Sequence, residues 1–329
     1  MKRREFVFAA ASAAAMHAMP VRAQGKMHRI ALLSGGTKPD TALLLAALLE
    51  GMREFGYQEG RHFTLEARYA DYSAERALKL AAEVAALKPA VIVANGGGIA
   101  PAYRLSPSLP LVFLQSGNPV DAGFADSFAR PGRHATGVSL MALDLIAKRL
   151  DLLRRVQPKL RRVAFIASPE HAGQKRELAA SQAAADQLAL SVSYHEARNP
   201  AELVQALEKV AAERPDAALL FSDALMSGQR QMLADFFLKH RIPSAASWSA
   251  FVDSGHLLSY GPERRSSYRR LAYFVDQIIK GTPPGAIPIE LPAVVELVVN
   301  RQTAASLGLA LPQEILLRAD RIVEGTAKL

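Results

Sequence analysis

The chain has 329 residues, of which 50% are hydrophobic and 22% charged, and its formal net charge is +9. This balance excludes a disordered or fibrous protein, and the length exceeds what one hydrophobic core usually supports, so we expect two domains. The absence of cysteine excludes both disulfides and a lipid-modified N-terminal cysteine.

The first 23 residues have the pattern of a cleavable export signal. A basic start precedes a short Ala-rich apolar run, and Val21 and Ala23 place small residues before a cleavage point at Gln24. The apolar run falls below the roughly 20 residues that a membrane-spanning helix needs. Residues 3–7 resemble a twin-arginine motif, but Lys2 stands where Ser or Thr is preferred, so both export routes stay open. We expect a free periplasmic protein with its signal cleaved, not a lipoprotein.

The net charge does not indicate a nucleic-acid partner. The leader carries four basic residues and one acidic residue, so it accounts for +3 and leaves +6 on the mature chain. The remaining basic residues are spread over amphipathic segments, without zinc-ligand spacing, an RNP-type aromatic strand or a Lys/Arg block. We therefore assign the charge to a soluble surface.

Hydrophobic patterns in the first half of the mature chain alternate between strands and helices. Apolar runs predict buried strands at 29–33, 90–94 and 111–114, and an alternating run predicts a half-covered strand at 62–69. Helical spacing between a capping residue and a Gly or Pro predicts helices that begin near 40 and 73. Strands that are apolar on both faces belong inside a parallel sheet covered by helices.

The same alternation recurs after Ser139 and predicts a second lobe of similar size. We expect helices at 143–156, 173–188, 200–213 and 229–240, with strands at 162–167, 191–195 and 217–221. The tail adds a strand at 255–261, a helix at 266–280, a linker at 281–285, a strand at 294–300 and two closing helices at 303–307 and 313–318.

These elements predict an α/β protein of two doubly wound parallel-sheet lobes joined by a three-crossover hinge. We place the crossovers near Ser139, Gly255 and Gly285. Lobe I then consists of residues 28–139 plus 255–285, and lobe II of residues 140–254 plus 286–329.

Ligands of doubly wound sheets bind beyond the carboxyl ends of the strands, so the residues just past the predicted strands are candidate ligand-binding residues. They are Ser34, Gly35, Gly36, Tyr72, Asn95, Gly96, Gly97, Gln115, Ser116, Gly117, Asn118, Ser139, Ser168, Ser222, Asp223, Trp248 and Tyr260. Gly-rich loops that lead into helices suit a carboxylate, Asp223 suits an ammonium, and the aromatic rings suit an apolar group. Because Gly, Asn and Ser also dominate ordinary turns, each has a purely structural alternative.

Enzyme signatures are missing from the sequence. The loop at 95–98 is not a dinucleotide fingerprint, because Pro101 stands where its third Gly is expected, and there is no P-loop. Ser116 lacks the upstream glycine of a nucleophile elbow, and the eight histidines form no H-E-x-x-H. We therefore expect no enzyme, no cofactor and no metal.

Two stretches of the sequence are similar to a known family. They are residues 118–132 with 135–139, and the tail motifs at 278–284, 299–300, 303–304, 307–309, 312 and 319–320. Here the chain resembles the substrate-binding proteins of ABC transporters, including tryptophan-binding-protein-like periplasmic components. The resemblance implies a type I periplasmic binding protein that clamps a small-molecule ligand between two lobes and delivers it to a permease and its ATPase. We also expect a monomer that is not an enzyme.

From the residues we expect a small carboxylate ligand, amino-acid-like, with an aromatic side chain among the options. Two alternatives stay open: a ligand-sensing module for a membrane receptor, and an exported enzyme on the same fold.

Overall fold

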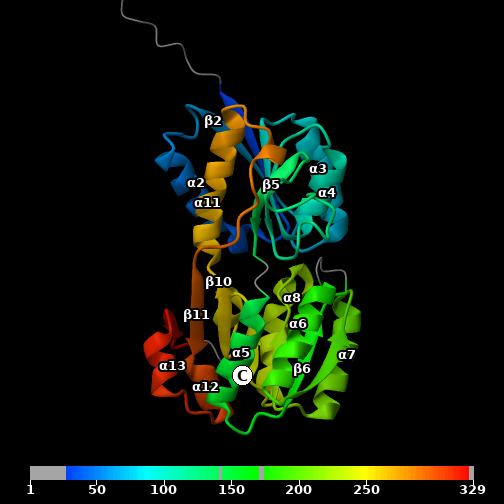
Figure 1. Ribbon diagram of the computed structural model, residues 1–329, viewed down its shortest axis with the longest axis vertical. Coiled ribbons are helices and arrows are strands. Elements are labelled where there is room, and N and C mark those ends of the chain that lie inside the picture. The colour runs from blue at the N-terminus through cyan, green and yellow to red at the C-terminus, as the bar shows by residue number, and fades with distance from the viewer. Residues whose placement is uncertain (1–26, 141–142, 170–173, 326–329) are drawn as a thin grey trace, which may run out of the picture.

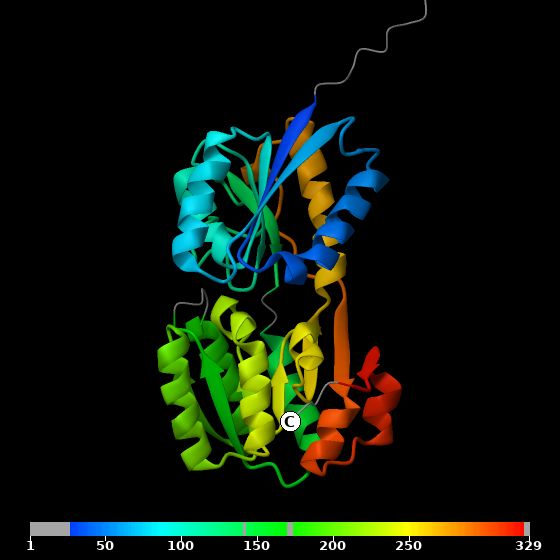
Figure 2. The ribbon, with the colours of Figure 1, turned by 180° about the vertical axis from the view of Figure 1, so that it is seen from behind.

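The computed structural model describes residues 27–140, 143–169 and 174–325, so the expected export signal lies outside the described residues. Two α/β lobes are stacked along the long axis, and the chain passes between them three times (Figures 1 and 2). The predicted doubly wound, two-lobe fold is confirmed. Within the described residues, no helix is long and apolar enough to cross a membrane.

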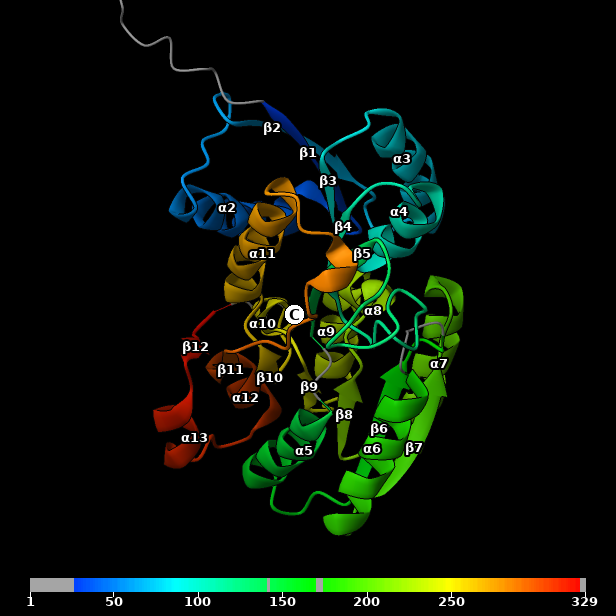
Figure 3. The same cartoon turned by 45° about the horizontal axis from the view of Figure 1, so that its top comes forward.

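Lobe I is built on a five-stranded, fully parallel sheet in the order β2-β1-β3-β4-β5. The strands are β1 (His28–Ser34), β2 (Phe63–Tyr69), β3 (Val91–Asn95), β4 (Leu111–Gln115) and β5 (Ala135–Ser139). Helices α2 (Lys38–Glu54) and α11 (Arg264–Ile279) lie side by side on one face (Figure 3), and α3 (Ala74–Ala86) and α4 (Ile99–Leu105) cover the other. Leu32 packs toward the first pair and Leu33 toward the second, which explains why the strands are apolar on both faces.

Lobe II is built on a seven-stranded sheet in the order β12-β11-β10-β9-β8-β6-β7, in which only β10 and β11 pair antiparallel. Its strands are β6 (Arg162–Ala167), β7 (Ser191–Glu196), β8 (Ala217–Leu220), β9 (Ser244–Ala246), β10 (Leu258–Pro262), β11 (Val295–Asn300) and β12 (Arg321–Val323).

Helices cover both faces of this second sheet as well. One face carries α5 (Asp144–Val156), α6 (Gln174–Gln187), α12 (Arg301–Leu307) and α13 (Gln313–Arg318). The other carries α7 (Pro200–Glu213), α8 (Ala224–Gly228), α9 (Arg230–Lys239) and α10 (Ser249–Asp253).

The second and third crossovers lie later in the chain than the sequence suggested. Residues 255–262 belong to lobe II, not lobe I, because β10 pairs with β9 and β11. Residues 286–290 belong to lobe I, not lobe II, because Thr136 Oγ1 donates to the Ile287 carbonyl (2.7 Å) and Ser139 N donates to the Glu290 carbonyl (3.0 Å). The hinge therefore consists of the links from β5 to α5, from β10 to α11, and from Glu290 to β11.

Candidate ligand-binding site between the lobes

A cavity lies between the lobes, at the carboxyl ends of the lobe I strands. Loops after β1, β2, β3 and β4 form one wall, and α8 with Trp248 forms the other. The free volume is about 50 Å³, far below the roughly 300–1,000 Å³ of ordinary small-molecule pockets. The lobes are therefore nearly closed on each other in this structure.

Ten of the seventeen candidate residues line this cavity: Ser34, Gly35, Gly36, Tyr72, Asn95, Gly96, Gly97, Ser116, Asp223 and Trp248. The cavity also has lining residues that are not among the candidates chosen just past the predicted strands. They are Asp40, Thr41, Leu114, Leu140, Ala224, Ser227 and Arg264. Most of these lie inside or beside helices rather than just past strands. Whether any of the set contacts a ligand stays a prediction.

Seven candidate residues lie outside the cavity lining: Gln115, Gly117, Asn118, Ser139, Ser168, Ser222 and Tyr260. Several of them have local structural roles. Asn118 Oδ1 closes a turn by accepting from Val120 N (2.8 Å), and Ser222 Oγ accepts from Ser247 N (3.1 Å). Tyr260 lies within β10, next to the core that faces α5. For Asn118, Ser222 and Tyr260, the structure supports a role in a turn or in packing.

The loops after β1 and β3 are packed backbone against backbone. Gly35 N donates to the Asn95 carbonyl (3.0 Å), and a Cβ atom at Gly35 would collide with Gly97 N. Asn95 Nδ2 donates to Ser34 Oγ (3.2 Å) and to the buried Tyr268 hydroxyl. The Asn95 amide therefore joins the two loops and α11, a structural role that the sequence did not reveal.

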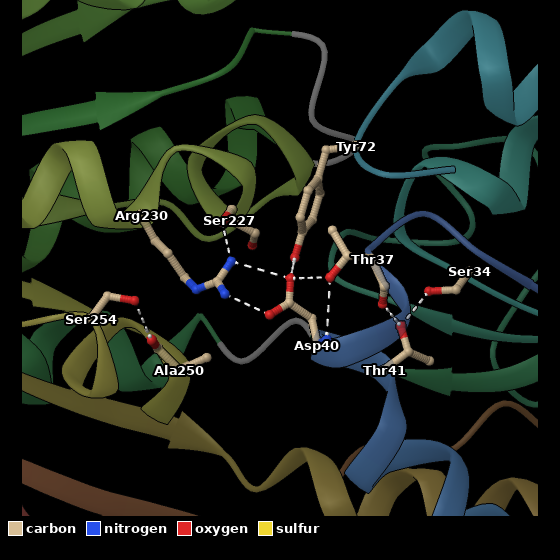
Figure 4. Close-up of polar contacts among 9 residues, drawn as sticks. All are labelled: Ser34, Thr37, Asp40, Thr41, Tyr72, Ser227, Arg230, Ala250 and Ser254. Carbon is tan, nitrogen blue, oxygen red and sulfur yellow. Dashed lines mark hydrogen bonds and ion pairs between the residues drawn. The ribbon is translucent and has the colours of Figure 1, made fainter. Parts of the chain in front are cut away.

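Asp40 is the centre of a cluster that reaches across the cleft (Figure 4). It lies in the first turn of α2, whose N-cap Thr37 accepts from Asp40 N (3.2 Å). The Asp40 carboxylate accepts from the Tyr72 hydroxyl (2.8 Å) and pairs with Arg230 of α9, with an Nη2–Oδ1 distance of 2.5 Å. Asp40 and Tyr72 belong to lobe I and Arg230 to lobe II, so this ion pair joins the lobes.

The same cluster shifts the acidities of its members. Burial alone would raise the pKa of Asp40, but hydrogen bonds from Tyr72 and Thr37 and the charge of Arg230 outweigh it and lower that pKa. Burial is the main cause that raises the pKa of Tyr72 to about 12, and the hydrogen bond to Asp40 raises it further. At neutral pH the cluster therefore holds a carboxylate, a neutral phenol and a guanidinium.

On the lobe II side, Asp223 is the N-cap of α8, where its Oδ1 accepts from Met226 N (2.8 Å). Asp223 was expected to suit an ammonium, with a structural role as its alternative, and one of its carboxylate oxygens has a structural role because it caps the helix. Trp248 is nearly buried, and the guanidinium carbon of Arg264 lies 4.8 Å from its ring centroid. Within the described residues, no group of three or more His, Asp or Glu side chains could hold a metal ion.

Two doubly wound lobes that enclose a cavity at their strand ends define the type I periplasmic binding protein fold. The family model described as ABC transporter substrate binding protein matches residues 37–323, and the chain belongs to this family. A relative named tyrosine-binding protein, from Clostridioides difficile, is 22% identical over 265 residues, which span 79% of this chain and 74% of the relative.

Solved structures share the fold across nearly the whole chain. An ABC domain in complex with L-Trp from Streptococcus pneumonia has a TM-score of 0.84 at 17% identity, with 91% of this chain and 100% of that chain covered. A conserved domain protein from Vibrio cholerae has a TM-score of 0.83 at 20% identity, with coverages of 90% and 100%. The ligand-free, open structure of a substrate-binding protein from Clostridium difficile has a TM-score of 0.68 at 17% identity, with coverages of 91% and 100%.

Proposed function

We propose that the protein is the periplasmic solute-binding component of an ABC importer, and that it binds an amino-acid-like carboxylate, preferably aromatic, in the cavity between its lobes. The observation that carries this proposal is the lining of that cavity, to which both lobes contribute polar and apolar side chains. A ligand that contacts both lobes at once favours the closed arrangement.

The comparisons support this ligand class. One relative is named tyrosine-binding protein, and one solved structure with the same fold is in complex with L-Trp. The small free volume of the cavity agrees with a closed arrangement. Entry of a ligand the size of tyrosine then requires the lobes to separate about the hinge.

The proposed partners follow from the family. A closed, loaded receptor presents both lobes to a permease and its ATPase, which would release the ligand by favouring the open form. We propose that the receptor itself is a monomer, since each lobe has its own core and the cavity is completed within one chain.

Thermal unfolding with a panel of L-tyrosine, L-tryptophan, L-phenylalanine, aromatic acids, purines and sugars tests this function. An amino acid at one hundred times its Kd should stabilise the protein by about 2.7 kcal/mol and raise Tm by several degrees. Chromatography of the incubated ligand should show it unchanged. Stabilisation by neutral sugars or nucleosides alone would contradict the ligand class, and conversion of the ligand would contradict the receptor role.

A further inference from the structure

Tyr72 lies in the loop between β2 and α3 of lobe I, and its side chain reaches the boundary with lobe II (Figure 4). The backbone is left-handed at both Asp71 and Tyr72, with φ angles of 50° and 60°. Residues other than glycine adopt this conformation at a cost in free energy. Hydrogen bonds from Asp71 N to the Gly36 carbonyl (3.2 Å) and from Tyr72 N to the Gly35 carbonyl (2.8 Å) hold the loop. The loop therefore keeps the Tyr72 side chain in one place, against the preference of its own backbone.

The ring of Tyr72 packs against Gly228, the last residue of α8 in lobe II. A Cβ atom at Gly228 would lie 3.0 Å from Tyr72 Cγ, 3.1 Å from its Cβ and 3.3 Å from its Cδ2, all closer than an ordinary van der Waals contact. The first two of these atoms lie next to the Tyr72 backbone, so rotation of the ring would not relieve the clash. The φ angle of Gly228 lies outside the left-handed region, so its own backbone does not require glycine. The close approach of Tyr72 is what requires glycine at this position.

Hydrogen bonds join the two sides of this contact as well. The Tyr72 hydroxyl donates to Asp40 (2.8 Å), and Asp40 pairs with Arg230. Arg230 Nη1 also donates to the carbonyl of Ser227 (2.8 Å), the residue before Gly228. These contacts form a closed ring that runs from Tyr72 through Asp40 and Arg230 to the end of α8 and back to Tyr72. Because α8 belongs to lobe II, the ring is complete only when the lobes are closed.

The contact also affects the size of the cavity. Tyr72 lines the cavity from lobe I, and Ala224 and Ser227 of α8 line it from lobe II. The separation of Tyr72 from α8 therefore sets the separation of two cavity walls. Packed protein surfaces have little free space, so an added methyl group at such a contact has to be accommodated by movement.

We propose that the contact between Tyr72 and Gly228 sets how far the lobes close, and that Gly228 is a positioning residue for ligand binding. This inference rests on the proposed function. Gly228 itself does not line the cavity, so a side chain there acts on the ligand through the separation of the lobes. A ligand that contacts both lobes then loses part of its contacts, and its affinity falls.

Fluorescence energy transfer between the lobes tests this proposal. The chain has no cysteine, so Leu78→Cys in α3 and Val204→Cys in α7 place one dye on each lobe. Both positions are exposed, and both helices lie on the side away from the link between β10 and α11 (Figure 1). In the labelled protein, with and without L-tyrosine, Gly228→Val should lower the transfer efficiency. In calorimetric titration, Gly228→Ala should weaken L-tyrosine roughly 3- to 10-fold and Gly228→Val roughly 10- to 100-fold.

Controls separate closure from folding. Gly228→Ala should not lower Tm, because alanine is favoured over glycine in a helix and the lobes can separate without straining either core. Ala201→Val, which enlarges a side chain at an exposed position of α7, should close and bind as the wild type does. In a Tyr72→Ala chain the space above α8 is free, so Gly228→Val should cost no further affinity or transfer efficiency.

The outcomes separate this inference from the function on which it rests. Wild-type transfer efficiency and affinity in a folded Gly228→Val protein overturn the closure contact and leave the receptor function intact. An equal loss from Gly228→Val with Tyr72 present or replaced overturns the pairing of the two residues. If L-tyrosine does not bind the wild type, the proposed ligand is wrong, and equal transfer efficiency in the ligand-free wild type and Gly228→Val overturns the closure contact too. If Gly228→Val does not fold, Gly228→Ala decides the question in the same measurements.

Discussion

Replacing Asp40 by Asn should shift the ligand-free protein toward an open arrangement. The Asp40–Arg230 pair joins the lobes through contacts of 2.5 Å and 3.4 Å, and the two side chains are 28% and 25% exposed. The free energy that such a half-buried pair contributes lies between that of a surface ion pair, about 0.2–1 kcal/mol, and that of a charge-assisted hydrogen bond, about 1.5–3 kcal/mol. A loss of about 1–2 kcal/mol changes the ratio of closed to open protein by a factor of roughly 5–30.

Small-angle X-ray scattering measures this shift directly. Ligand-free Asp40→Asn should have a larger radius of gyration than the wild type, and a saturating ligand should restore compactness. Glu50→Gln is the matched control, because it breaks an ion pair with Arg265 that lies entirely within lobe I. Addition of salt should lessen the difference, since both side chains are partly exposed.

A double-mutant cycle with Arg230→Gln separates the ion pair from other effects of each substitution. The double variant should have a radius of gyration little larger than that of Asp40→Asn alone. Identical scattering from the wild type and Asp40→Asn, together with equal ligand affinity, would refute the reasoning. A second pair, Asp121–Arg176 at 2.8 Å, also joins the lobes and should behave in the same way.

Three further measurements test single features. Burial lowers the pKa of His256 to about 4, below the usual value of about 6.5. The free energy of unfolding should therefore fall by at most about 3 kcal/mol as the pH falls from about 6.5 to 4, because the unfolded chain binds a proton there that the buried imidazole does not. A Tm that does not fall over this window would contradict this expectation. The lowered pKa of Asp40 means that the lobe-joining ion pair persists at pH 5 and weakens only in stronger acid, which scattering at pH 3–5 can check. Gly51→Ala should cost about 1–3 kcal/mol in urea unfolding, because a Cβ atom would collide with the Arg269 carbonyl where α2 meets α11, whereas the exposed Leu43→Ala should change little.

Hydrophobic patterning predicted most of the architecture because buried parallel strands leave a strong local signal. The strands β3 and β4 and their loops were found where the sequence placed them. Strand β9 (Ser244–Ala246) was missed, because three small residues carry no periodicity and pair only in the context of the sheet. The lobe assignment of β10 was wrong for a related reason: strand pairing, not sequence order, decides which sheet a segment joins.

The site could be predicted only in part. Residues just past the strands were found, since the fold fixes where strand ends meet. Asp40 and Arg264 were missed because they begin helices, and only the tertiary arrangement turns their side chains toward the cleft. A helix start that follows a site loop was the available signal for Asp40. No local pattern distinguishes Arg264 from Arg265, although the first lines the cavity and the second pairs with Glu50.

Blocking the cavity tests the central claim most directly, and Gly97 is the position for it. Gly97 lines the cavity, and a Cβ atom there meets no other atom within 4 Å, so a large side chain can be added without displacing the backbone. We expect such a side chain to fill the cavity. Calorimetric titration of Gly97→Phe with L-tyrosine should show no binding, whereas Gly97→Ala should keep one site per chain. Equal binding by both variants would place the ligand elsewhere and contradict an amino-acid site between the lobes.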